Sequence, residues 1–105
     1  MTSFEEREKG YEAKFKHDQE FQFKATARRN KLLGLWAAEK LGLSGGDADV
    51  YAKEVVIADF EEPGDEDVVR KVAGDLDGKG VTAEDVRREM ERLMSVAAEQ
   101  VANES

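Results

Sequence analysis

The side chains best suited to chemistry in this 105-residue sequence are three cations close together, followed shortly by its only tryptophan. Arg28, Arg29 and Lys31 offer donors for phosphate oxygens, and Trp36 lies a short way further along the same stretch. No glycine-rich phosphate loop accompanies them. Two interpretations stay open: a site for ATP or ADP as a regulatory ligand, or a charged helix face that pairs with the acidic remainder of the chain, which is the commoner arrangement.

A second candidate site is the twelve-residue run DLDGKGVTAEDV, from Asp75 to Val86. It is similar to an EF-hand calcium loop, with acids at positions 1 and 3 and a glycine at position 6. Position 5, however, is Lys79, and Val86 replaces the glutamate that would close the shell at position 12. We therefore predict no metal ion here, but a glycine-rich turn and a helix that Thr82 caps.

Residues for nucleophilic or acid–base catalysis are scarce. The sequence has no cysteine and one histidine, His17, and it contains no GxGxxG, P-loop or HExxH motif. A nucleophile–base pair is therefore hard to build, and we predict no catalytic residue and no enzyme activity. His17 could titrate near neutral pH and act as a switch, but a single exposed histidine more often has no such role.

The charge is divided unevenly along the chain, whose net charge is −8. Residues 1–40 carry 9 basic and 7 acidic side chains, net +2, and residues 41–105 carry 7 and 17, net −10. An acidic body argues against nucleic acid as a partner, since phosphates need a basic footprint, and favours a protein partner. No run is apolar enough for membrane insertion and no signal peptide is evident, so a cytoplasmic location is expected.

The stretch 20–42 is the element expected to organise the fold. Its apolar residues follow helical spacing, and we predict a central helix with Trp36 as a core anchor. The predicted inner face runs through Phe21, Ala25, Arg28, Leu32, Leu35 or Trp36, and Glu39.

Three further helices are predicted, which makes the fold all-α, a four-helix bundle over 20–105. The second spans about 45–62, and its Asp59 either pairs with a basic residue of the central helix or, as we favour, lies at a wet edge. Asp65 is expected to cap the third, and the fourth runs from Thr82 to about Ala102. The residues predicted to face inward are Ala48, Tyr51, Ala52, Val55 and Ala58; Val68 or Val69, Val72 and Leu76; and Val86, Met90, Leu93, Ala97 and Val101.

Residues 1–19 are predicted to form an arm. Phe4, Tyr11 and Phe15 share one helical face among charged neighbours, while Gly10 weakens the helix. The arm is thus flexible or marginally helical. Two interpretations carry equal weight: a frayed terminus, or a helix that forms when it enters a partner's groove.

Several motifs in fixed order resemble one family over essentially the whole chain. These are FEERE near the start, AKF, the run ARRNKLLGLWAA from Ala27 to Ala38, YAKEVV, DFEE and GDEDV. Together they closely resemble the zeta inhibitor subunit of alphaproteobacterial F-type ATP synthases.

The resemblance implies a four-helix bundle preceded by an inhibitory amino-terminal segment. In that family the segment enters the catalytic head between the alpha and beta subunits, near gamma, and blocks rotation in the hydrolysis direction. The implied partner is therefore the head of the ATP synthase, which would place the protein at the periphery of the inner membrane. The positions that match the segment are Phe4, Glu5, Arg7, Glu8, Tyr11, Glu12, Lys14 and Phe15.

Two functions from different classes follow. The first is a non-catalytic inhibitor of ATP hydrolysis, monomeric when free and without a cofactor, whose bundle holds the arm at the head. The second is a nucleotide-responsive regulatory protein that uses Arg28, Arg29, Lys31 and Trp36. Chemical-shift changes at the basic residues on adding ATP or ADP would favour the second function.

Overall fold

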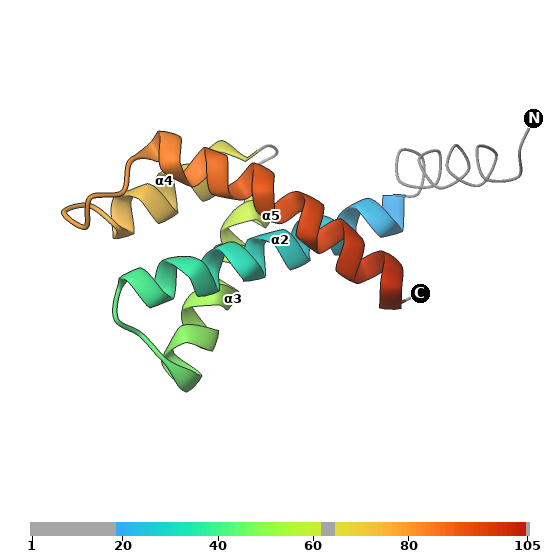
Figure 1. Ribbon diagram of the computed structural model, residues 1–105, viewed down its shortest axis with the longest axis horizontal. Helices are drawn as coiled ribbons and strands as arrows, with labels where there is room; N and C mark the ends of the chain where they lie inside the picture. Colours follow the sequence, from blue (N-terminus) through green and yellow to red (C-terminus); the bar gives the residue numbers. More distant parts are fainter. Residues whose placement is uncertain (1–18, 62–64, 105) are drawn as a thin grey trace, which may run out of the picture.

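The structure, a computed structural model, describes residues 19–61 and 65–104. These residues form helices α2 (Gln19–Lys40), α3 (Gly45–Glu61), α4 (Glu66–Asp75) and α5 (Ala83–Glu104), as Figure 1 shows. The predicted all-α, four-helix class is confirmed. Residues 1–18 of the predicted arm, His17 among them, lie outside the described residues, whereas its last residue, Gln19, is the first residue of α2.

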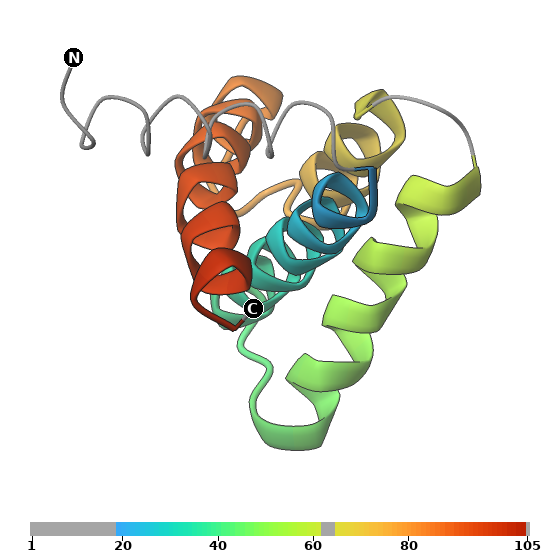
Figure 2. The ribbon, with the colours of Figure 1, turned by 90° about the vertical axis from the view of Figure 1, so that its right-hand side faces the viewer.

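Helix α2 is the centre of the bundle, as its apolar content predicts. It contacts each of the three other described helices. Figure 2 shows α2 between α5 on one side and α3 on the other, while Figure 1 shows α2 and α5 side by side and antiparallel. Because two helices cover it, α2 buries more of its circumference than a surface helix with a single apolar face.

The predicted inner face of α2 is wrong beyond its first turns. Phe21 and Ala25 are buried as predicted, but Glu39 is exposed. Two adjacent stripes are buried instead, each with residues at steps of four along the helix. Arg28, Leu32, Leu35 and Trp36 are only partly buried, and the buried positions are Arg29, Asn30, Leu33, Gly34, Ala37 and Ala38.

Trp36 is not the core anchor that the sequence predicts. Its indole is partly buried at the edge of the core, with the Lys40 ammonium 5.1 Å from the ring centroid. The centre of the core is occupied by smaller residues, among them Leu33 and Val55. Tryptophan often occupies such an edge, because its large ring is rarely enclosed on all sides.

The other three helices bury the positions that their periodicity predicts. In α3, Tyr51, Ala52 and Val55 are buried, while Ala48 and Ala58 are partly buried. The predicted inner faces of α4 and α5 are confirmed in full: the buried residues are Val68, Val69, Val72 and Leu76, followed by Val86, Met90, Leu93, Ala97 and Val101.

Gly34 allows a close approach between α2 and α3. A Cβ atom built on it would lie 2.5 Å from the Cα atom of Ala52 and 3.1 Å from its Cβ atom. Real Cβ atoms do not come so near another backbone atom, so only glycine permits this contact. The two helices therefore cross with their backbones almost touching.

Hydrogen bonds of side chains fix the end of α4 and the start of α5, on either side of the turn that joins them. The Tyr51 hydroxyl donates to Asp75 over 2.8 Å, and Lys71 donates to the same carboxylate over 3.1 Å. Burial, together with this hydrogen bond, raises the pKa of Tyr51 well above its usual range. At the start of α5, the predicted Thr82 cap is confirmed: Asp85 N–H donates to Thr82 Oγ1, and Thr82 N–H donates to Asp85 Oδ2.

The α5 cap predicts a pH-dependent contribution to stability. The hydrogen bonds from Thr82 lower the pKa of Asp85 below its usual value. A carboxyl group with a lowered folded-state pKa stabilises the fold above its unfolded-state pKa, and this contribution is lost as the pH falls through the folded-state pKa. Asp85→Asn is therefore expected to be less stable than the unaltered chain at pH 7 but not at strongly acidic pH. Urea denaturation at a series of pH values measures this, and a pH-independent difference would contradict it.

Candidate interaction surfaces and the polar seam of α2

The N-terminal half of α2 is anchored to the C-terminal half of α5. The two halves project together beyond α3 and α4 on the right of Figure 1. Phe21 and Ala25 form a second small core there with Val101. Arg28 binds Glu104 with its Nη2 atom, at 2.6 and 2.9 Å from the two carboxylate oxygens, and donates from Nη1 to Gln100 over 2.9 Å. The start of α2 therefore has a defined direction relative to the bundle.

A polar seam crosses the buried side of α2. Arg29 and Asn30 are 4% and 1% exposed, the only buried polar or charged residues among those described. The Asn30 oxygen accepts from Arg29 Nε at 3.1 Å and Nη2 at 2.9 Å, while its nitrogen donates to Asp59 over 3.0 Å. The same guanidinium binds Asp65, with Nη2 2.8 Å from Oδ1.

This seam joins three elements. Asp59 lies in the last turns of α3, and Asp65 immediately precedes α4. Asp65 accepts from Arg29 and Asp59 accepts from the neighbouring Asn30, which ties the start of α4 and the end of α3 to the central helix. Asn30 shares its oxygen with Arg29 and so holds the guanidinium in the plane that meets Asp65. We call Arg29, Asn30, Asp59 and Asp65 the polar seam.

Two predictions about acids are corrected by the seam. Asp65 stands at the N-cap position of α4 but forms no side-chain cap hydrogen bond, because its carboxylate turns to Arg29. Asp59 is partly buried, as at the predicted edge, but it also has a partner on the central helix. That partner is the neutral Asn30 rather than a basic residue.

The four residues predicted for nucleotide binding do not share one pocket. Arg28 and Lys31 line a pocket between α2, α3 and α5. Arg29 lines another beside α4, and Trp36 lines a third next to Lys40. The alternative interpretation, in which the cations pair with acids of the same chain, holds for Arg28 and Arg29. Nucleotide binding stays an untested prediction.

Sequence reasoning missed Asn30 and Gly34. An asparagine among cations is typical of a solvated helix face, and an isolated glycine in a helix has no apolar side chain to mark it as buried. The only available signal is their spacing, because Asn30, Gly34 and Ala38 follow one another at steps of four along one side of the helix. This spacing becomes informative only once α3 is known to cover it.

The described residues form an all-α bundle whose polar groups hold its helices to one another. Among these residues, none of the helices is long and apolar enough to span a bilayer, and no cluster of acidic or histidine side chains could hold a metal ion. The family model for ATPase inhibitor subunit zeta matches residues 1–100. The chain belongs to this family.

The fold also has a solved relative. A solution NMR structure is 64% identical in sequence, with a TM-score of 0.72, and the match covers 80% of this chain and 98% of that one. No curated protein matches the chain.

Proposed function

We propose that this protein inhibits ATP hydrolysis by the F-type ATP synthase and has no catalytic activity of its own. Its N-terminal segment inserts into the interface of the alpha, beta and gamma subunits in the catalytic head and blocks rotation, while the bundle stays outside as a monomeric holder. The protein would then be peripheral to the inner membrane through its partner. The observation that carries the proposal is the family match, which includes the whole predicted arm.

The chemistry of the arm supports insertion. Phe4, Tyr11 and Phe15 recur at helical spacing and supply the apolar anchors that a groove-bound helix needs. Their charged neighbours fix the register without burying much area. The anchored start of α2 supports it as well, because a segment that continues from a fixed helix searches a smaller volume than a free peptide.

A triple substitution in the full chain tests the arm. Replacing Phe4, Tyr11 and Phe15 with alanine is expected to raise the concentration needed for half-maximal inhibition more than about hundredfold, since buried aromatic anchors each contribute about 2 kcal/mol or more. ATP hydrolysis by purified ATP synthase is the measurement. A chain reduced to residues 20–105 is expected to show no inhibition.

The matched control places three alanines on the exposed surface of the bundle, at Lys79, Glu91 and Asn103. None of these residues belongs to the predicted arm, so inhibition should stay within about twofold of that of the unaltered chain. Full inhibition by the triple arm variant would refute insertion through these aromatics. A nucleotide-responsive role has no converging set of residues to support it and stays a separate prediction.

A further inference from the structure

The large apolar side chains exposed among the described residues all belong to α2 and α3. Phe23, Val50 and Ile57 are 57%, 58% and 57% exposed. Phe23 lines one pocket and Ile57 the next, and the two pockets share Lys31 and Val56. They therefore form one continuous depression, which we call the α2–α3 groove, lined by Phe23, Ala27, Lys31, Lys53, Val56 and Ile57.

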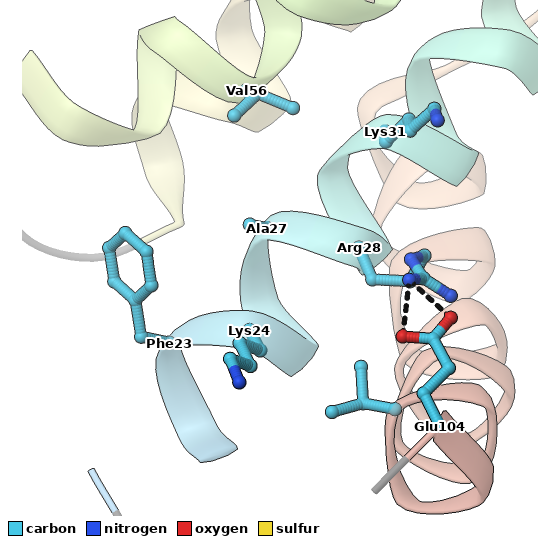
Figure 3. Close-up of a pocket in the computed structure, with 8 residues that line it drawn as sticks. Phe23, Lys24, Ala27, Arg28, Lys31, Val56 and Glu104 are labelled. Carbon is cyan, nitrogen blue, oxygen red and sulfur yellow. Dashed lines mark hydrogen bonds and ion pairs between the residues drawn. The ribbon is translucent and has the colours of Figure 1, made fainter. Parts of the chain in front are cut away.

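The groove results from the way the two helices cross. Figure 2 shows α3 crossing α2 rather than running along it. Their backbones come close together at Gly34 and Ala52. The two helices stay joined as far as Asn30 and Asp59, and the start of α2 projects beyond α3 (Figure 1). Figure 3 shows the result: Phe23 and Val56 lie on either side of an opening, with Ala27 between them. Single exposed apolar residues need no explanation, but a continuous apolar depression between helices is suited to receive another helix.

The charges around the groove are opposite in sign to those of the whole protein. The two pockets that form the groove are lined by two acidic side chains, Asp49 and Glu104, and by four basic ones: Lys24, Arg28, Lys31 and Lys53. Glu104 is neutralised by Arg28, and Lys24 forms only an exposed pair with Glu20. In the part of the chain that the structure describes, Lys31 and Lys53 have no ion pair. Within residues 19–61 and 65–104, a protein of net charge −8 thus presents two ammonium groups without an ion pair beside an apolar surface.

This combination selects an occupant by its chemistry. An amphipathic helix with an apolar stripe flanked by Asp or Glu would cover Val56 and Ile57 and pair with Lys31 and Lys53. A second copy of this chain suits the groove poorly, because two bodies of net charge −8 repel each other. Residues 1–18 carry five acidic and four basic side chains, net −1, and lack the acidic excess.

We propose that the α2–α3 groove docks an acidic amphipathic helix of the ATP synthase head. The inference rests on the proposed function and deepens it. The groove adds affinity to that of the arm, and the arm alone supplies inhibition. Because the two surfaces are separate, changes in the groove should weaken binding without lowering the inhibition reached at saturation.

Charge reversal in the full chain is the first test. Lys31→Glu with Lys53→Glu is expected to weaken binding to purified ATP synthase by about tenfold or more, since like charges then face each other across the interface. The matched control is Lys79→Glu with Arg88→Glu, which changes the net charge equally at exposed positions on the far end of the bundle. The control should bind within about threefold of the unaltered chain, because distant exposed charges are screened.

An apolar substitution is the second test. Ile57→Ser removes an exposed anchor without disturbing the core, and binding is expected to weaken about tenfold. Ile57→Leu keeps the apolar volume and should bind as the unaltered chain does. At saturating concentration every groove variant should still inhibit ATP hydrolysis fully.

The outcomes separate this inference from the proposed function. Normal binding by both groove variants would overturn the inference alone, as would equal weakening by the charge control. Chemical shifts in residues 1–18 that respond to Ile57→Ser, or a dimer that this change dissociates, would identify another occupant and also overturn it. If the unaltered chain neither binds nor inhibits the ATP synthase, both proposals fall.

Discussion

Gly34→Ala is expected to lower the free energy of unfolding by about 2 kcal/mol, although alanine is the better helix former. Helix propensity alone would favour alanine by about 1 kcal/mol. The new methyl group, however, would lie 2.5 Å from the Cα atom of Ala52, and a backbone atom cannot move aside as a flexible side chain can. Overpacking of this kind typically costs about 1–3 kcal/mol, and sometimes more where the backbones of two helices must separate.

The matched control is Gly74→Ala in α4. No atom lies within 4 Å of a Cβ atom built on Gly74, so the substitution keeps the gain in helix propensity and meets no obstacle. It should raise the free energy of unfolding by up to about 1 kcal/mol. Urea denaturation followed by circular dichroism measures both variants. If Gly34→Ala were as stabilising as Gly74→Ala, the close crossing of α2 and α3 would be refuted.

The crossing also matters for the proposed docking surface. Because α3 crosses α2 at Gly34 and Ala52, the contact between these two residues determines where Val56 and Ile57 lie relative to the start of α2. A variant at Gly34 that still folds would therefore present an altered groove. The same glycine would contribute to both stability and the shape of the surface.

Asn30→Ala is expected to cost about 3 kcal/mol, the larger of the two stability effects. The side chain is 1% exposed, and its three hydrogen bonds all go to charged groups. A hydrogen bond to a charged group contributes about 1.5–3 kcal/mol, and a buried donor left unpaired costs its desolvation. Arg29 Nε has Asn30 as its hydrogen-bond acceptor, so the buried guanidinium would lose its orientation toward Asp65.

The same substitution on the surface isolates this effect. Asn103 is exposed near the end of α5, and Asn103→Ala should change the free energy of unfolding by less than about 0.5 kcal/mol. A double-mutant cycle of Asn30→Ala with Asp65→Ala is expected to show a coupling of about 1 kcal/mol, because the two side chains share one guanidinium. Strict additivity would mean that Asn30 and Asp65 are not coupled through the Arg29 guanidinium.

The polar seam also has a consequence for folding specificity. Arg29 and Asn30 occupy positions that apolar residues could fill, so the seam is a costly way to stabilise a helix pair. The hydrogen bonds of the seam are directional, however, whereas apolar contacts are not. Asp59 and Asp65 lie on either side of the link between α3 and α4, and the seam brings both to one point on α2.

The sequence by itself determined the helices and most of the core. The strong periodicity of α4 and α5 predicts every buried position that the structure shows there, from Val68 to Val101. The Thr82 cap is a local pattern of two residues three apart and needs no tertiary context. Family membership also rests on the order of the residues along the chain, which the motifs from Phe4 to Val68 display.

Only the tertiary structure decided which side of α2 is buried. A helix covered by two neighbours has no single apolar face to detect. The polarity of the side chains therefore gave the wrong prediction for α2, in which Arg29 and Asn30 are buried and Trp36 lies at the edge of the core. The role of Asp65 could not be predicted either, since its choice between a helix cap and Arg29 depends on a residue 36 positions away. Local patterns follow from neighbouring residues, whereas the seam, the Gly34 crossing and the groove exist only where separate helices meet.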